Sequence, residues 1–122
     1  MGSSLGQSMD TSPVIRMWIT NKFDRTITSE MHEAMVDFLS AAVEQGCLGS
    51  TFAEDSERII VFTRWMDELT LETFRSSKAY KEREADIIHS FVAAGFEIPE
   101  DILFNATASV LFSNRSNPAE QS

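Results

Sequence analysis

The stretch RIIVFTRW, residues 58–65, is apolar on both faces of the strand that it predicts. Successive side chains of a strand point to opposite faces of its sheet. Ile59, Val61 and Trp65 therefore share one face, and Ile60 and Phe62 share the other. A strand with one face in water reads polar at alternate positions, and this stretch does not. A chain with such a strand has to cover both faces of its sheet.

The stretch ILFNATASVLF, residues 102–112, predicts a second strand with apolar residues on both faces. Ile102 and Phe104 point one way, whereas Leu103 and Leu111 point the other. An apolar sheet face left open to water would exceed the few hundred Å² that monomers tolerate. We expect a homodimer in which two sheets pack face to face, because a second copy buries both patches. A different protein partner is the alternative.

Polar caps, glycines and apolar spacing place the other elements along the chain. Ser29 is a candidate N-cap, and Gly46 is a natural left-handed stop for the helix between them. The paired serines of RSSKAY, residues 75–80, predict a break in a second helical region. The predicted elements are a strand at 14–23, a helix from Ser29 to Gly46, strands at 47–55 and 58–65, a helical region at 69–94 and a strand at 102–112.

The order βαββαβ predicts an α+β, ferredoxin-like domain. Its four-stranded antiparallel sheet would carry two helices on one face. We expect a single domain at residues 13–112, a flexible N-terminal arm at 1–12 and a flexible C-terminal tail at 113–122. Both ends are rich in small and polar residues that have little to bury.

The acidic composition excludes several classes of partner. A net charge of −9 repels phosphate backbones and anionic lipid heads, so we expect no nucleic acid and no membrane as partner. The start of the chain has neither the basic nor the apolar part of a signal peptide, which favours a cytoplasmic protein. Two isolated histidines and Cys47 form no recognisable ligand set, so we expect no metal.

The segment VFTRWMDELTLETFRSSKAY, residues 61–80, resembles the antibiotic biosynthesis monooxygenase family of dimeric α+β barrels. The similarity lies in a strand that ends in tryptophan, followed by acidic, apolar, aromatic, serine and basic positions. These positions are Trp65, Asp67 or Glu68, Leu69, Leu71, Phe74, Ser77, Tyr80 and Lys81. In pattern, the resemblance covers about residues 14–112. It implies a small dimer with a pocket between sheet and helices, whose wall includes the strand-end Trp65.

Members of this family differ in activity. Some oxidise phenolic or quinol-like substrates with molecular oxygen and neither metal nor flavin, others degrade haem, and several have no known activity. The haem-degrading branch resembles this chain at Asn21 and Trp65, but Glu84 occupies the position expected for its histidine, and His89 lies further along. Because a carboxylate is a poor substitute for a proximal imidazole, we expect no haem and no other cofactor.

Oxygen chemistry without a cofactor needs an electron-rich substrate, a base, a cation near the developing oxyanion and walls that exclude water. Candidate bases are His89 and His32, candidate cations are Arg16 and Arg64, and Asn21 or Asn105 would orient a carbonyl. The preferred catalytic set is His89, Asn21 and Arg16, and the substrate-binding set is Trp65, Trp18, Phe74 and Tyr80.

Several of these residues have a structural alternative. Trp65 is either a core residue or a pocket wall, Arg64 belongs to the dimer interface if it faces away from Trp65, and the Tyr80 hydroxyl is a candidate cap at the helix break. The leading hypothesis is a cofactor-independent monooxygenase that acts on a small aromatic or quinol-like metabolite. The alternative is a non-catalytic dimeric module that binds an apolar ligand or a protein.

Overall fold

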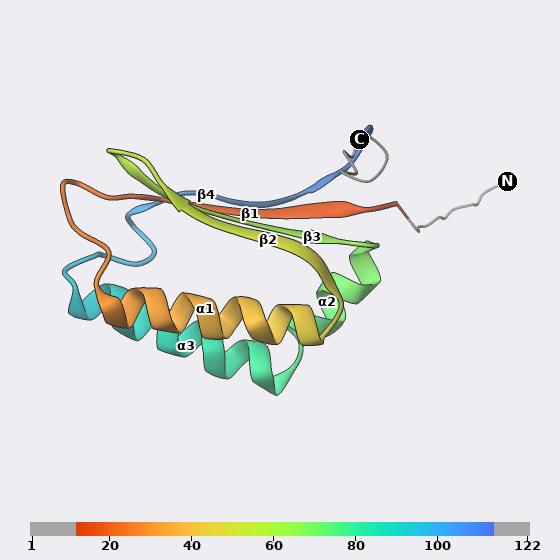
Figure 1. Ribbon diagram of the computed structural model, residues 1–122, viewed down its shortest axis with the longest axis horizontal. Coiled ribbons are helices and arrows are strands. Elements are labelled where there is room, and N and C mark those ends of the chain that lie inside the picture. Colours follow the sequence, from red (N-terminus) through yellow and green to blue (C-terminus); the bar gives the residue numbers. More distant parts are fainter. Residues whose placement is uncertain (1–11, 114–122) are drawn as a thin grey trace, which may run out of the picture.

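The computed structural model describes residues 12–113 as a four-stranded sheet with three helices on one of its faces (Figure 1). The strands lie in the order β2-β3-β1-β4, and each neighbouring pair is antiparallel. The elements are β1 (Val14–Asn21), α1 (Ser29–Glu44), β2 (Cys47–Glu54), β3 (Arg58–Trp65), α2 (Glu68–Arg75), α3 (Lys78–Ala93) and β4 (Ile102–Ser109). The predicted ferredoxin-like fold is confirmed. The expected arm at 1–12 and tail at 113–122 lie outside the described residues, apart from residues 12 and 113.

The predicted break in the second helical region separates α2 from α3. Ser77 is the N-cap of α3, because its Oγ accepts a hydrogen bond from the Tyr80 backbone N at 3.1 Å. The same hydroxyl donates to the Phe74 carbonyl oxygen at 2.6 Å, which ties the new helix to the end of α2. Ser77, and not the Tyr80 hydroxyl, therefore caps the break.

The first helix begins where the sequence predicts but uses a different cap. Thr28, one residue before the expected Ser29, accepts from the Met31 backbone N at 3.1 Å. At the other end, Gly46 has a φ of +111°, and a Cβ there would lie 2.9 Å from Cγ2 of Thr70. Both the backbone angle and the close approach of α2 require glycine at this turn.

The strands β1 and β4 each end earlier along the chain than the sequence predicts. β1 ends at Asn21 and not at residue 23, because Phe23 and Asp24 take positive φ angles of 51° and 67° and turn the chain. β4 ends at Ser109, which pairs with Val14, the first residue of β1. The Val110 backbone N donates to the Pro13 carbonyl oxygen at 2.9 Å, one residue before β1 begins, and the ladder with β1 itself ends at Ser109.

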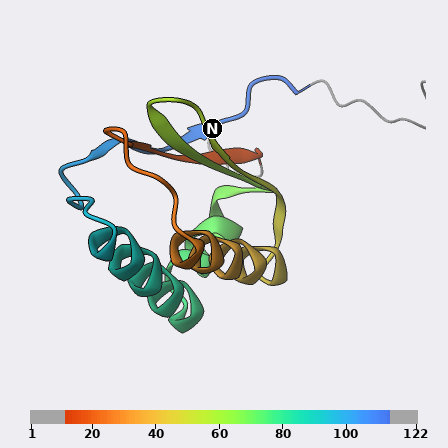
Figure 2. The ribbon, with the colours of Figure 1, turned by 60° about the vertical axis from the view of Figure 1, so that its left-hand side comes forward.

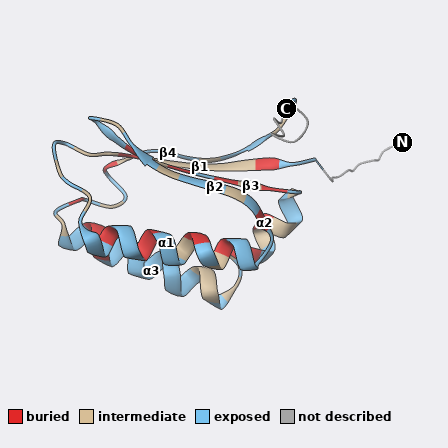
Figure 3. Cartoon of the chain, viewed as in Figure 1, coloured by how far each residue is buried: buried red, intermediate tan, exposed pale blue. Residues whose placement is uncertain are grey.

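Two apolar clusters fill the space between the sheet and the helices. The larger includes Met31, Ile59 and Phe91, each 0% exposed, and the smaller is built around Trp65 and Phe74. Figure 3 shows the buried residues of α1 on the side that faces the sheet. Figure 2 shows α1 and α3 side by side beneath the strands. The helices therefore cover one sheet face, as predicted.

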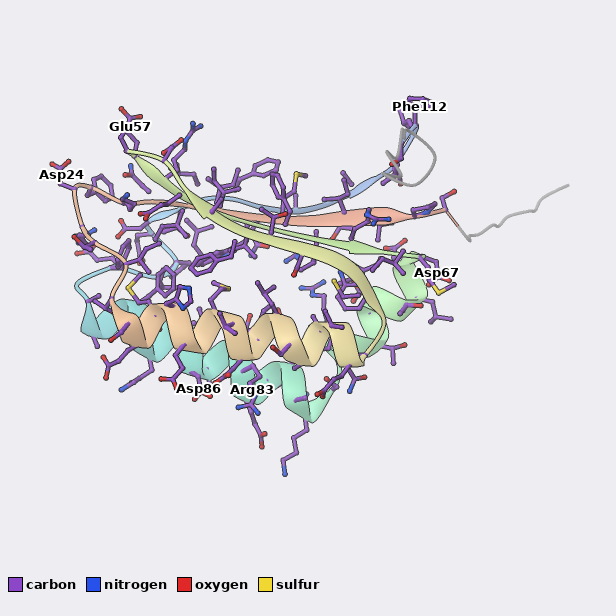
Figure 4. All side chains as sticks on the ribbon, in the orientation of Figure 1. Asp24, Glu57, Asp67, Arg83, Asp86 and Phe112 are labelled. Atoms are coloured by element: carbon purple, nitrogen blue, oxygen red, sulfur yellow. The ribbon has the colours of Figure 1, made fainter. Side chains whose placement is uncertain are left out.

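The opposite face of the sheet is apolar and carries no helix within residues 12–113. Phe62 and Phe104 are 38% and 46% exposed on this face. A register shift in β4 pairs Ile102 with the buried Thr20 and Phe104 with Ile19, so the prediction that Ile102 and Phe104 share a face is wrong. Figure 4 shows Phe112 on this side of the sheet, whereas Arg83 and Asp86 point away from the sheet on the far side of α3. No helix among the described residues is long and apolar enough to cross a bilayer.

Candidate functional site

A cavity opens between the helix-covered face of the sheet and the helices α2 and α3. It has a volume of ≈ 810 Å³ when the part open to solvent is included. Pockets for small organic ligands are mostly apolar and have a few polar groups that fix the orientation of the ligand. The lining comes from three strands and all three helices, with Ile98 from the loop before β4. The site therefore depends on the whole fold and not on one motif.

The inner wall of the cavity is aromatic. Trp65, at the end of β3, stacks on Phe74 of α2 with ring centroids 5.4 Å apart and 27° between the ring planes. Phe74 meets Tyr80 of α3 edge to face at 5.3 Å. Trp65 is only 1% exposed and donates from Nε1 to Thr63 Oγ1 at 2.9 Å, so its indole N–H is already satisfied. Trp65 is therefore both a core residue and part of the cavity wall.

A second aromatic surface comes from β1. Trp18 lies on the helix-facing side of β1 and meets Phe91 of α3 edge to face, with ring centroids 5.3 Å apart. Trp18 also lines the cavity, so indole groups of two different strands border the same space. Such rings offer flat apolar surfaces on which an aromatic ligand can stack.

Arg16 brings a positive charge to the cavity from the strand position two residues before Trp18. Its Nη1 donates to Thr107 Oγ1 of the neighbouring β4 at 3.0 Å. Burial lowers the pKa of Arg16, and the nearby charge of Arg75 lowers it further. A guanidinium nevertheless stays protonated at neutral pH. Arg16 thus provides a half-buried cation that is hydrogen-bonded to a neutral hydroxyl.

Arg75 adds a second guanidinium from the end of α2. Its Nη1 donates to Glu72 Oε2 at 3.1 Å, and its buried Nε has no hydrogen-bond partner among the described residues. Burial works to lower the pKa of Arg75, but interactions with Tyr80 and Glu72 outweigh it and the pKa is raised. The cavity therefore contains one paired arginine and, in Arg16, one without a carboxylate within salt-bridge distance among residues 12–113.

Tyr80 and Glu84 form a hydrogen-bonded pair on the cavity side of α3. The Tyr80 hydroxyl donates to Glu84 Oε2 at 2.9 Å, and both residues line the cavity. Burial raises the pKa of Tyr80, and the negative charge of Glu84 raises it further. Tyr80 is therefore a protonated donor at neutral pH, and Glu84 is its acceptor.

The mouth of the cavity lies between β4 and α3. Glu84 and Ile88 of α3 and Asn105 of β4 line the cavity and are themselves exposed to solvent. The buried aromatic residues lie further inside. A ligand would therefore enter with its apolar part first and keep its polar edge near the charged mouth.

The structure brings five of the seven predicted site residues together. Arg16, Trp18, Trp65, Phe74 and Tyr80 all line the cavity, and their roles there stay predictions. The alternative carbonyl ligand Asn105 also lines it.

Asn21 and His89 lie away from the cavity lining. Asn21 ends β1, where its Oδ1 accepts from the Phe23 backbone N at 3.1 Å. His89 is exposed on α3, and the second candidate base, His32, is exposed beside Phe52 with ring centroids 5.7 Å apart. Arg64 alternates with Trp65 and Thr63 along β3, so it lies on the helix-free face of the sheet.

Sequence reasoning did not select three polar residues of the lining: Thr63, Arg75 and Glu84. Glu84 follows Tyr80 by four residues, so the two side chains share one face of α3. That spacing was visible in the sequence. The positions of Thr63 and Arg75 depend on how β3 and α2 pack together, which the sequence pattern did not reveal.

The described residues hold no cluster of three or more histidine, cysteine, aspartate or glutamate side chains arranged to bind a metal ion. Besides aromatic and aliphatic side chains, the groups that line this cavity are two guanidiniums, a phenol, an aliphatic hydroxyl, a carboxylate and an amide.

Comparison with known proteins gives similarity in structure but not in sequence. No known family profile matches the sequence, and no curated protein matches it. A protein from Chloroflexus aurantiacus, provisionally described as an antibiotic biosynthesis monooxygenase, has a similar structure with a TM-score of 0.59 and 12% identity. The similarity covers 85% of this chain and 98% of that protein.

Two further structures have the same fold. SnoaB, a cofactor-independent oxygenase from Streptomyces nogalater, is 8% identical with a TM-score of 0.57, over 89% of this chain and 98% of SnoaB. A protein from Caulobacter crescentus, provisionally described as an antibiotic biosynthesis monooxygenase, is 11% identical with a TM-score of 0.56, over 85% of this chain and 93% of that one. The chain therefore has the fold of proteins described as antibiotic biosynthesis monooxygenases, as its segment at residues 61–80 predicted.

Proposed function

We propose that the protein is a cofactor-independent oxygenase that oxidises a small aromatic or quinol-like metabolite with molecular oxygen. The observation that carries this proposal is the aromatic cavity with its charged mouth. Arg16 supplies a positive charge to the lining, and the aromatic residues of the lining are Trp18, Trp65, Phe74 and Tyr80. The fold supports it, because SnoaB, a cofactor-independent oxygenase, shares that fold.

The cavity would bind the substrate through its rings. Trp65 and Phe74 are nearly parallel and tightly packed, so they form a rigid wall. Rigid aromatic walls bind a flat ligand without having to be ordered first, and they exclude water from the reacting atoms. The Trp65 indole N–H already donates to Thr63, so a ligand that packs against this wall does not have to supply a hydrogen-bond acceptor for it.

The reaction would begin with loss of an acidic proton from the substrate. The electron pair left behind makes a phenolate or enolate, and Arg16 stabilises its negative oxygen. That anion is the reductant: it passes one electron to oxygen, and the two resulting radicals combine into a peroxide. The peroxide anion takes up a proton. Its O–O bond and the remaining C–H bond on the same carbon then break, so that water leaves and a new carbonyl remains on the product. The substrate supplies all the electrons, so the scheme calls for neither metal nor flavin.

The predicted roles of Asn21 and His89 stay predictions. Neither residue lines the cavity in the free protein, so a catalytic role would require the substrate or a structural change to reach them. Replacing each with alanine checks this. If either variant loses turnover while its ligand affinity is unchanged, the expected role stands.

We also propose that two copies pair through the helix-free face of the sheet. Phe62 and Phe104 lie on this face, where Phe62 alternates with the buried residues of β3. Burying such apolar surface is favourable by about 25 cal/mol per Å². Since a two-fold pair covers the same patch on both copies, no other partner is needed. A cytoplasmic location stays a prediction.

Oxygen uptake tests the proposed function. The purified protein, treated with a chelator, is mixed with a panel of anthrone-like and naphthol-like compounds in an oxygen electrode. We expect uptake above the buffer rate that falls in Trp65→Phe and persists in Leu69→Ala, because Leu69 is 74% exposed on α2. Tight ligand binding without uptake would favour the alternative, a non-catalytic dimeric module.

A further inference from the structure

The cavity contains few groups that can accept a proton. Arg16 and Arg75 are donors only, because a guanidinium has no free lone pair. Asn105 and Thr63 are very weak bases, and the Thr63 hydroxyl already accepts from Trp65 Nε1. Of the residues that line the cavity in the described part of the chain, only Tyr80 and Glu84 remain as candidates.

The hydrogen bond between Tyr80 and Glu84 indicates which of the two residues can accept a proton from a ligand. Because the pKa of Tyr80 is raised by burial and by the charge of Glu84, its hydroxyl keeps its proton at neutral pH. It donates that proton to Glu84 Oε2 at 2.9 Å, which leaves the second carboxylate oxygen of Glu84 free of a described hydrogen bond. The carboxylate is then the group that can take a proton from a ligand.

The position of Glu84 on α3 is also suitable. Tyr80, Glu84 and Ile87 follow one another at the spacing of one helix face, and all three line the cavity. His89 lies five residues beyond Glu84, about 140° further around the helix at ~100° per residue. The helix thus directs the carboxylate into the cavity and the imidazole away from it.

The surroundings of Glu84 hold the carboxylate in place and leave it able to exchange protons with water. Tyr80 orients it from one turn earlier on α3, and Arg16 on β1 is close enough for the two charges to interact. Arg75 on α2 forms its ion pair with Glu72 and not with Glu84. Glu84 is exposed at the mouth, and a proton taken from a ligand can pass on to solvent.

We propose that Glu84 is the general base of the cavity and that Tyr80 positions it, so that the carboxylate removes the acidic proton of an aromatic ligand. The inference rests on the proposed function in placing that ligand in this cavity. In the step, the C–H or O–H bond of the ligand breaks, the proton moves to the free carboxylate oxygen, and the electron pair stays on the ligand. Nothing is oxidised at this point, so the step proceeds without oxygen.

Hydrogen exchange tests this step separately from oxidation. Anthrone is a suitable probe, because its central CH₂ group is acidic and its anion is delocalised over the fused rings. The protein is incubated with anthrone in D₂O without oxygen, and deuterium uptake at the CH₂ group is followed by NMR. We expect the wild-type protein to accelerate uptake and Glu84→Gln to lose about a hundredfold of that acceleration.

Two further variants make the result specific. Glu82→Gln makes the same chemical change on the same helix at a residue that pairs with Lys78, so it should exchange as fast as the wild type. Glu84→Asp keeps the carboxylate but withdraws it by one methylene, so its rate should lie between those of the wild type and Glu84→Gln. Circular dichroism and anthrone titration check that each variant is folded and binds the probe.

The outcomes distinguish this inference from the proposed function. Wild-type protein that does not accelerate exchange, or Glu84→Gln that exchanges as fast as the wild type, would overturn Glu84 as the base. Exchange that depends on Glu84 but is never followed by oxygen uptake in air would uphold the base and overturn the oxygenase. Oxygen uptake by Glu84→Gln at the wild-type rate would uphold the oxygenase and overturn Glu84 as the base.

Discussion

Trp65 stacks on Phe74 with ring centroids 5.4 Å apart, and this contact joins the end of β3 to α2. The two residues are 1% exposed, yet both line the cavity. The same pair therefore supports the fold and shapes the binding surface. A substitution here changes stability and ligand binding together, so the two effects have to be measured separately.

Removing the indole should destabilise the protein. Trp65→Ala leaves a cavity beside Phe74 and removes the hydrogen bond to Thr63. We expect the free energy of unfolding to fall by about 3–5 kcal/mol, the usual range for a buried aromatic residue replaced by alanine. Urea denaturation measures it. A loss below about 1 kcal/mol would mean that Trp65 is not the packed core residue described here.

The N-cap of α3, which is hydrogen-bonded to Phe74, should also contribute to the stability of the protein. Ser77→Ala removes both the acceptor for the Tyr80 backbone N and the donor to the Phe74 carbonyl. We expect a loss of about 1 kcal/mol in unfolding free energy. Ser76→Ala is the matched control, since Ser76 is exposed and is not the N-cap. Equal effects from the two substitutions would contradict the capping role.

Much of the fold could be predicted from the sequence, because apolar spacing, caps and glycines are local signals. β3 at Arg58–Trp65 has the predicted bounds, and Gly46, the predicted left-handed stop, has a positive φ at the end of α1. The misplaced ends have non-local causes. β4 stops at Ser109 because β1 begins at Val14, and no pattern within residues 102–112 contains that information.

The site was partly predictable for a related reason. Trp65 and Phe74 belong to one continuous segment with a recognisable pattern, and Trp18 and Arg16 share a strand face. The predicted base was a histidine, His89 or His32. Neither histidine lines the cavity, whereas the spacing of Glu84 from Tyr80 places its carboxylate at the cavity mouth. Charge type alone did not predict which face of a helix would border a cavity.

Acid should weaken the β2–β3 turn through Asp55. Hydrogen bonds from the Arg58 side chain and from backbone N–H groups lower the pKa of Asp55 from 3.8 to about 2. Since this pKa is lower when the protein is folded, the contribution is present above about pH 4 and is lost as the pH falls towards 2. The wild type should therefore lose more stability than Asp55→Asn over this interval.

Urea denaturation at several pH values between 5 and 2 measures the difference between the two proteins. Asp37→Asn serves as a control, because it removes an equal charge from an exposed position on α1. Parallel acid profiles for the wild type and Asp55→Asn would contradict the assigned role.

The proposed dimer should separate when its face becomes charged. Phe62→Glu places a carboxylate on the helix-free side of β3, where two copies would meet. We expect light scattering to give the mass of a dimer for the wild type and of a monomer for the variant. Val43→Glu is the control, because Val43 is an exposed apolar residue on α1 with 54% exposure. A wild-type monomer at high concentration, or an unchanged mass for Phe62→Glu, would refute this interface.

The central claim is that an aromatic ligand occupies the cavity between the sheet and the helices. The chain has two tryptophans, Trp18 and Trp65, and both line this cavity. Their indole N–H resonances in a ¹H–¹⁵N NMR spectrum therefore report directly on its occupancy. Titration with 2-naphthol should shift both resonances in a saturable way, with the same dissociation constant. Saturable binding by calorimetry that leaves both resonances unmoved, or no binding at all across the panel of aromatic compounds, would contradict the claim.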